Sequence, residues 1–218
     1  MKFKDLPGMK PCYFKKGEIL IHDGDRVDYV YYLRKGTVYR EIVTSKGVES
    51  ILSCKEGGGL TDSIIGILLL YGVKPPYISH NNFVAGTDCY CLRIPVASIK
   101  QYLHSDADLL EELVATALHE CNYLMSLYLG KSELPAPAAL CAWLLEHARK
   151  EDDGAYYLKH YSHNEIAKFL NLHKVTVSRI FGVLRKEGVL EKTPKGLRVN
   201  DLVRVRAYAA NEIHMIYS

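Results

Sequence analysis

HNEIAKFLNLHKVTVSRIFGVL, residues 163–184, predicts two short helices that meet at Asn171. Apolar residues in each half recur three or four positions apart, as on the buried face of a helix. They are Ile166, Ala167 and Leu170 in the first half, and Val177, Ile180, Phe181 and Leu184 in the second. A left-handed backbone is needed at the corner, and asparagine adopts it more readily than most residues other than glycine. The segment therefore predicts a compact helical corner.

The second helix of this corner, about residues 174–186, carries polar side chains on the face opposite its apolar residues. These are Lys174, Thr176, Ser178 and Arg179, with Val175 between them. Ammonium, hydroxyl and guanidinium groups donate hydrogen bonds to phosphates and base edges. The pattern is typical of a helix-turn-helix whose second helix enters the major groove of DNA. An ordinary helical hairpin is the alternative interpretation.

Charge is distributed unevenly along the chain. Residues 156–218 contain 11 Lys and Arg against 5 Asp and Glu, whereas residues 1–155 contain 17 against 20. A basic surplus confined to the part with the helical corner suits contact with phosphates. The acidic excess in the longer part argues against a second DNA-binding surface there.

Length and composition set the broad class. A chain of 218 residues with 48% hydrophobic residues can form two domains with separate cores. The first 20 residues contain five Lys and lack the apolar stretch of a signal peptide. The longest apolar run, Ile64 to Val73, is about half as long as a membrane helix. We therefore expect a cytoplasmic protein without a membrane partner, and its six Cys are expected to be reduced thiols.

Short apolar stretches separated by turn signals predict an antiparallel sandwich or barrel over about residues 12–94. Asp23-Gly24-Asp25 and Lys46-Gly47 are two of these signals. A short buried helix is expected at Leu60–Tyr71. The expected strands are Ile19–Ile21, Val27–Leu33, Thr37–Val43, Val48–Leu52, Phe83–Val84 and Tyr90–Ile94.

A long helix is predicted over about Asp106–Leu129, capped by Ser105 or Asp106 and ended by Gly130. One set of apolar positions follows coiled-coil spacing and would face a second copy of the helix. A second set would pack on the β domain, and a single wide core face is the alternative. The first set is Leu110, Val114, Ala117, Cys121, Leu124 and Tyr128; the second is Leu109, Leu113, Leu118 and Met125.

The stiff segment Leu134-Pro135-Ala136-Pro137 predicts a joint between domains. A helix is expected after it at Ala138–Lys150, ahead of the helical corner. The chain then forms a basic β-hairpin around the turn Thr193–Gly196, which completes a winged helix-turn-helix. Lys192, Lys195 and Arg198 are its basic residues. The expected domains are a β domain at 1–105, a dimerisation helix at 106–131 and a DNA-binding domain at 132–218.

Elements of this order and size resemble the Crp/Fnr family of bacterial transcription regulators. FKKG at 14–17, YLRKGTV at 32–38, EIA at 165–167 and VTVSR at 175–179 carry the resemblance. NNFVA at 81–85 and HKVTVSR at 173–179 are most similar to the subgroup that regulates organohalide respiration in response to chlorinated phenols.

The family resemblance implies an α+β fold in which residues 1–105 form an effector-sensing domain. It comprises an N-terminal cyclic-nucleotide-binding-like β-roll (a double-stranded β-helix, or jelly roll), a long dimerisation helix and a C-terminal winged helix-turn-helix. It also implies a non-enzymatic homodimer that binds an inverted-repeat promoter site in double-stranded DNA and acts on RNA polymerase.

Two departures from the family narrow the expected effector. Cyclic-nucleotide-binding members hold the phosphate with an Arg-containing string, but residues 57–91 contain a single Lys or Arg, which is Lys74. Oxygen-sensing members hold an iron–sulfur cluster with grouped N-terminal cysteines, but only Cys12 precedes Cys54. We therefore expect neither a cyclic nucleotide nor a cofactor.

A small apolar or aromatic effector is expected instead, between the roll and the long helix. Glu120 stands where the phenol-sensing relatives have a Lys, and a carboxylate would repel a phenolate. The same residues would otherwise be ordinary core. The apolar candidates are Ile67, Leu70, Tyr71, Tyr77, Phe83, Leu118 and Tyr123, and the polar anchors are Lys74, His80, His119 and Glu120.

Other hypotheses stay open. His80, His119, Cys89 and Cys91 permit a haem- or metal-binding regulator, and the two cysteines permit a thiol redox switch. A metabolite-binding protein or an enzyme with an incidental helical hairpin is the alternative from another class. The sequence has no nucleophile elbow, P-loop or zinc-protease motif to support an enzyme.

Roles in DNA recognition follow from the side chains. Arg179 suits guanine O6 and N7, and Thr176 and Ser178 suit phosphate or base. Many family members have Glu at the position of Val175, where it accepts from cytosine N4; valine can instead contact a thymine methyl. Lys174, Lys192 and Lys195 are expected on phosphates, and half-sites should lie about one helical turn apart.

Overall fold

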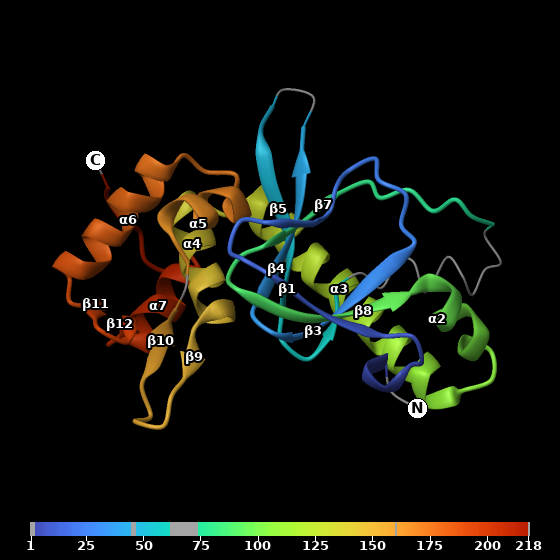
Figure 1. Cartoon of the computed structure of the whole chain (residues 1–218). Coiled ribbons are helices and arrows are strands. Elements are labelled where there is room, and N and C mark those ends of the chain that lie inside the picture. The colour runs from blue at the N-terminus through green and yellow to red at the C-terminus, as the bar shows by residue number, and fades with distance from the viewer. Residues whose placement is uncertain (1–2, 45–46, 62–73, 160, 218) are drawn as a thin grey trace. The chain divides into compact units, whose positions relative to one another are not determined.

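The computed structural model describes residues 3–44, 47–61, 74–159 and 161–217, with the backbone alone for residues 126–133. The chain divides into two compact units, Met1–Met125 and Ser126–Ser218. The division falls inside the long helix, and each unit has its own sheet structure (Figure 1).

The first unit contains the strands β1 (Lys10–Phe14), β2 (Ile19–Ile21), β3 (Tyr29–Lys35), β4 (Thr37–Val43), β5 (Glu49–Glu56), β6 (Gly59–Leu60), β7 (Asn82–Ala85) and β8 (Cys89–Pro95). They form two four-stranded sheets in the orders β1-β8-β3-β6 and β2-β7-β4-β5. Every neighbouring pair is antiparallel. The expected β-roll is therefore confirmed, and a short 3-10 helix at Phe3–Asp5 precedes it.

Alternate residues of the strands fill the space between the two sheets. Leu33, Phe83 and Cys89 are at most 1% exposed there. The turn from β3 to β4 approaches β8 so closely that a Cβ on Gly36 would lie 2.5 Å from the carbonyl oxygen of Asp88. Because Gly36 also has φ of 108°, no other residue fits this turn without strain.

The helix expected at Leu60–Tyr71 does not begin where we predicted, because Leu60 belongs to β6. Residues 62–73, which include most of that expected helix, lie outside the described residues.

Two helices follow the roll, α2 (Val96–Leu103) and α3 (Ala107–Glu133). The Asp106 carboxylate accepts a hydrogen bond from the backbone N–H of Leu109 at 3.1 Å, which confirms Asp106 as the cap of α3. The predicted end at Gly130 was wrong, since α3 continues to Glu133. A glycine only weakens a helix, whereas the following Pro135 prevents its continuation.

The apolar positions of α3 divide differently from our prediction. Leu109 and Leu113 are buried in the roll core, as expected. Leu118 and Met125, expected beside them, are 60% and 63% exposed. Leu118 lies about 140° further round the helix than Leu113, because five residues exceed one turn. The prediction for Leu118 and Met125 was therefore wrong.

Exposed apolar residues instead line another side of α3. They are Val114, Leu118, Cys121 and Met125, and we call them the α3 stripe. Their 4-3-4 spacing is that of a coiled-coil seam. Leu110, Ala117 and Leu124, which we expected in the seam, are half-buried, and the side chain of Tyr128 lies outside the described residues.

The second unit contains α4 (Ala136–His147), β9 (Arg149–Lys150), β10 (Tyr156–Leu158), α5 (His163–Leu170), α6 (Lys174–Lys186), β11 (Leu190–Thr193), β12 (Gly196–Val199) and α7 (Leu202–Ala209). Its sheet has the order β11-β12-β10-β9 (Figure 1). The winged helix-turn-helix is thus confirmed. The helix expected to reach Lys150 ends at His147 instead, because Arg149 and Lys150 pair with β10.

An aromatic cluster joins α4 to α5 in this unit. The His147 ring stacks on Trp143 with a centroid distance of 4.2 Å, and both rings also contact Phe169 and Tyr161. Nδ1 of His147 donates to the carbonyl oxygen of Trp143 at 2.9 Å. Burial lowers the pKa of His147 from 6.5 to about 4. This histidine is therefore a neutral core residue.

We predict that acid destabilises the second unit through His147. Its folded pKa of about 4 is below the unfolded value of 6.5, so the unfolded chain binds more protons between these pH values. The stabilisation is complete above pH 6.5 and falls by about 3 kcal/mol as pH drops towards 4. Denaturant titrations at several pH values should show a smaller loss in His147→Phe, which keeps an aromatic ring but cannot titrate. Equal losses in both proteins would contradict this assignment.

Candidate nucleic-acid interface

Local hydrogen bonds define the corner between α5 and α6. Ser162 caps α5: its hydroxyl accepts from the backbone N–H of Glu165 at 3.2 Å, and the Glu165 carboxylate accepts from the N–H of Ser162 at 2.6 Å. Asn171 then takes the left-handed conformation that we expected, with φ of 53° and ψ of 40°. The two helices meet through their predicted apolar faces, which are buried. This corner orients the start of α6.

A second contact holds the other end of α6. Glu187, just after the helix, accepts a hydrogen bond from the Tyr208 hydroxyl at 2.8 Å and forms an ion pair with Arg204 at 3.1 Å. Both partners lie on α7, an element that we did not predict. Helix α6 is therefore held at both ends, which limits the orientations that its exposed face can take.

The exposed face of α6 carries the predicted DNA-binding residues. Lys174, Ser178 and Arg179 are exposed, Val175 is 58% exposed and Thr176 is half-buried. Within the described part of the chain, the side chains of Lys174, Ser178 and Arg179 make no hydrogen bond or ion pair. Their donors are thus available to an external partner, and acidic side chains are absent from α6 itself.

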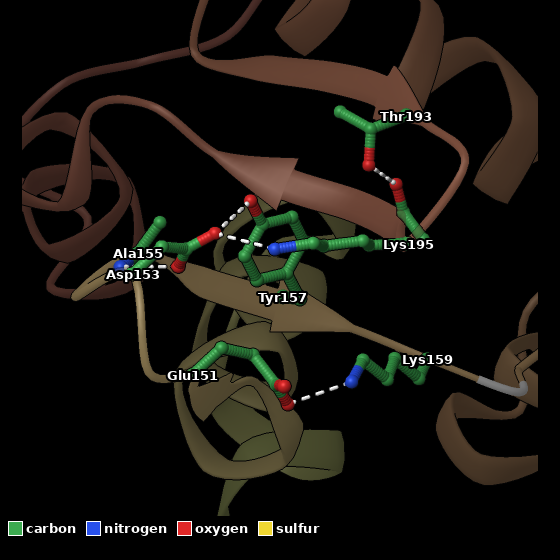
Figure 2. A network of polar contacts seen from close by, with 8 residues as sticks. Glu151, Asp153, Ala155, Tyr157, Lys159, Thr193 and Lys195 are labelled. Atoms are coloured by element: carbon green, nitrogen blue, oxygen red, sulfur yellow. Dashed lines mark hydrogen bonds and ion pairs between the residues drawn. The ribbon is translucent and has the colours of Figure 1, made fainter.

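The wing supplies further cations from β11 and β12. Lys192 and Arg198 are exposed, and neither side chain forms a hydrogen bond or ion pair among the described residues. Lys195 differs, because its ammonium lies 2.9 Å from the Asp153 carboxylate in the turn between β9 and β10 (Figure 2). Sequence reasoning missed Asp153. Its partner is 42 residues away, so no local pattern could have revealed it.

The expected effector residues occupy different environments. Tyr77 and Phe83 are buried in the roll core, at 6% and 1% exposure. Lys74, His80 and His119 are exposed, so these three polar candidates do not lie in the buried core beside Tyr77 and Phe83. Glu120 and Tyr123 are half-buried on α3, and the side chain of Tyr71 lies outside the described residues. Ile67 and Leu70 also lie outside them, and Leu118 is exposed as part of the α3 stripe.

Arg40 is a candidate that sequence reasoning missed. It lies opposite Phe83 in the β4–β7 pairing and therefore shares the face that points between the sheets. Its Nε is buried and makes no hydrogen bond with any described residue. A buried guanidinium nitrogen without an acceptor is costly, so the site favours an anionic or carbonyl group. The alternation of residues along the strand could not show this feature, because it does not reveal whether the Arg40 guanidinium has a hydrogen-bond acceptor.

The residues that would bind haem or form a redox switch also differ in their exposure to solvent. Cys89 and Cys91 are buried, and burial raises the pKa of Cys91 to about 12. A thiol protonated at neutral pH reacts slowly. His80 and His119 are exposed. Among the described residues, no group of three or more His, Cys, Asp and Glu side chains gathers that could hold a metal ion.

Two family models match the chain. The cyclic nucleotide-binding domain matches residues 11–106, and the Crp-like helix-turn-helix domain matches residues 138–208. The first match covers the roll and the second covers the corner and the wing. The chain belongs to the Crp/Fnr family of transcription regulators. As such a regulator it has a DNA-binding helix-turn-helix, which confirms the class of function predicted from residues 163–184.

Individual relatives agree with membership of the Crp/Fnr family. The transcriptional activator protein FnrA of Stutzerimonas stutzeri is 25% identical over 199 residues, which are 89% of this chain and 78% of the relative. The structure of FixK2 from Bradyrhizobium japonicum has a TM-score of 0.77 at 19% identity, over 92% of this chain and 96% of that chain.

CprK in complex with OCPA has a TM-score of 0.61 at 20% identity, over 89% of this chain and 88% of that chain. At this identity the similarity shows the fold, and the chlorophenol-responsive subgroup stays a prediction. No helix in the described part of this Crp/Fnr regulator is long and apolar enough to cross a bilayer.

Proposed function

We propose that this Crp/Fnr regulator is a homodimer that binds an inverted-repeat promoter site, and that a small apolar or aromatic effector controls its affinity. In this proposal residues 1–105 sense the effector, 106–131 dimerise and 132–218 bind DNA. The exposed face of α6 carries the argument, since the donors of Lys174, Ser178 and Arg179 have no partner among the described residues and the helix is fixed at both ends.

Each α6 would enter the major groove of one half-site. Arg179 would contact guanine O6 and N7, and Thr176 and Ser178 would bind phosphate or base edges. Lys174 and the wing cation Lys192 would bind phosphates on either side. Val175 can accept no hydrogen bond, but its exposed methyl groups suit a thymine methyl. We therefore expect an A·T pair at the position that Val175 faces.

Replacing Val175 tests this base preference. Val175→Glu should change the selected base from thymine towards cytosine, because a carboxylate accepts from cytosine N4 and a valine cannot. The expected discrimination is about 1–3 kcal/mol. Selection from a randomised duplex pool, followed by sequencing of the bound fraction, measures it. Val203→Glu, on the exposed side of α7, is the matched control. An unchanged preference in Val175→Glu would rule out a base contact at this position.

The α3 stripe supports the dimer. Val114, Leu118, Cys121 and Met125 expose apolar surface at coiled-coil spacing, and this surface would be covered by the same stripe of a second copy. In such a dimer each α6 would bind one half-site, and the two half-sites would lie about one helical turn apart. Effector binding would then alter the separation of the two α6 helices by shifting the paired α3 helices, and the bound dimer would act on RNA polymerase.

The roll interior supports an effector with an aromatic body and an anionic or carbonyl group. Tyr77 and Phe83 contribute aromatic surface to this core. Arg40, on the same inward face as Phe83, has a buried Nε that finds no acceptor in the described part of the chain. Residues 57–91 contain no Arg to bind the phosphate of a cyclic nucleotide. Chlorinated phenols and aromatic carboxylates are therefore the first compounds to test.

A panel of these compounds, with cyclic AMP for comparison, tests the effector class by thermal melting. A true effector at a hundred times its Kd should stabilise the protein by about 2.7 kcal/mol and raise its Tm by several degrees. Arg40→Met should abolish that rise without lowering the Tm of the free protein, because it removes an unsatisfied nitrogen. Arg34→Met, on the exposed side of β3, is the control. Stabilisation by cyclic AMP alone would overturn this proposal.

A further inference from the structure

Three donors converge on one carboxylate beside the wing (Figure 2). Oδ2 of Asp153 accepts from the Lys195 ammonium and from the Tyr157 hydroxyl, each at 2.9 Å. Oδ1 accepts from the backbone N–H of Ala155 at 3.1 Å. The Lys195 ammonium also lies 5.8 Å from the centre of the Tyr157 ring. Asp153 thus holds the wing cation on one side of the hairpin.

The wing turn itself is held in place. The Thr193 hydroxyl donates to the carbonyl oxygen of Gly196 at 2.8 Å and closes the turn. Gly196 has φ of 127°, and a Cβ there would lie 2.7 Å from the carbonyl oxygen of Leu158 on β10. The turn therefore lies directly against the strand that carries Tyr157. The backbone at Lys195 is therefore held in place, and the Lys195 ammonium points to the Asp153 carboxylate.

The neighbouring charges show that this pairing is selective. Glu151, in the same acidic turn, pairs with Lys159 at 2.7 Å. Asp152 is exposed and forms no ion pair among the described residues. On the wing, Lys192 and Arg198 are likewise without an acidic partner in the described part of the chain. Lys195 is thus the wing cation whose charge is already matched by an acid.

We propose that Asp153 is a positioning residue that withholds Lys195 from the DNA backbone, so that the wing binds non-specific DNA less strongly than its cations would allow. The proposal rests on the proposed contact between the wing and DNA phosphates. Phosphate contacts add affinity without sequence information. Removing one phosphate contact therefore lowers the affinity for non-specific DNA. The base contacts of α6 then determine which DNA sequence is bound.

Protonation does not release Lys195 near neutral pH. The hydrogen bonds from Lys195, Ala155 and Tyr157 lower the pKa of Asp153 from 3.8 to about 2. The folded value is the lower one, so the charged carboxylate persists above pH 3.8 and is lost only as pH falls through about 2. Release therefore requires a competing anion, such as a DNA phosphate, and is sensitive to salt.

Binding to a random-sequence duplex over a range of salt concentrations tests the proposal in the full-length protein. Asp153→Asn should tighten this binding several-fold at low salt and steepen the dependence of log K on log salt by about 0.9 per protomer, because one more phosphate contact forms. Lys195→Gln should weaken wild-type binding less than Lys192→Gln does. Adding Lys195→Gln to Asp153→Asn should remove the whole gain.

Asp152→Asn is the matched control, since it removes the same charge from the same turn without freeing Lys195. An equal gain in Asp152→Asn would overturn the proposal, because the effect would then be general electrostatics. A loss in Lys195→Gln as large as that in Lys192→Gln would also overturn it. Failure of the wild-type protein to bind any duplex would instead remove the proposed function. Circular dichroism and melting of each variant separate these results from unfolding.

Discussion

Arg179→Ala should lower the affinity for the selected inverted repeat by about 2–6 kcal/mol, since each of two half-sites loses about 1–3 kcal/mol. Arg179 is exposed on α6 and makes no hydrogen bond or ion pair with any described residue. Its guanidinium can therefore present two parallel donors to guanine O6 and N7. Alanine leaves those acceptors without a partner in a desolvated groove. Fluorescence anisotropy with labelled duplex measures the loss.

Whether the loss of affinity depends on DNA sequence distinguishes a base contact of Arg179 from a general effect of its charge. Arg179→Ala should reduce discrimination between the selected site and random duplex, with the change concentrated at one guanine of each half-site. Arg185→Ala removes the same charge from the same helix, but Arg185 bonds the carbonyl oxygen of Phe181 near the end of α6. Arg185→Ala should lower the affinity for the selected site and the affinity for random duplex to a similar extent. If both variants behaved alike, Arg179 would be a phosphate contact and the guanine assignment would be wrong.

Leu118→Glu should convert the proposed dimer into folded monomers and weaken binding to the inverted repeat by about 10²–10⁴-fold. This range is the usual gain when two linked modules bind together. Leu118 is 60% exposed, so glutamate needs no burial in the monomer. In the dimer it would place two carboxylates in an apolar seam, which is strongly unfavourable. Analytical ultracentrifugation measures the oligomeric state, and titration of the whole repeat measures affinity.

His119→Glu is the control for this experiment. His119 is exposed and adjacent in sequence, but it lies about 100° round the helix from Leu118 and outside the α3 stripe. It should remain dimeric in the absence of effector. Leu118→Glu should also keep its wild-type affinity for a single half-site, because α6 is unchanged. A dimer that persisted in Leu118→Glu would show that the stripe is not the interface.

Features that depend on near neighbours were predictable. Asn171 acts within a few residues of its position, so the corner between α5 and α6 was predicted from residue type. The Ser162 cap of α5 is equally local, but our sequence reasoning did not name it. The apolar face of α6 was equally clear, because its residues recur with helical spacing. Asp106 capped α3 as expected. These local preferences were sufficient to recognise the DNA-binding element.

The partition of α3 was less predictable. Apolar residues surround much of this helix, so spacing alone allowed more than one seam. Leu109 and Leu113 are buried because the roll lies against that side, and Leu118 and Met125 are exposed because the helix has turned away from it. The end of α3 was also misplaced, since a glycine is compatible with a helix that neighbouring residues continue.

The amino-acid sequence was sufficient to predict a two-part protein with a basic winged helix-turn-helix, because caps, turns and amphipathic periods depend on local chemistry. Its motifs added the resemblance to the Crp/Fnr family. Which charged side chains remain available to a partner depends on the tertiary structure. Strand pairing turns Arg40 inward, α7 brings Arg204 to Glu187, and the hairpin brings Asp153 to Lys195. These contacts join residues far apart in the chain, and their formation depends on strand register and packing rather than on neighbouring residues.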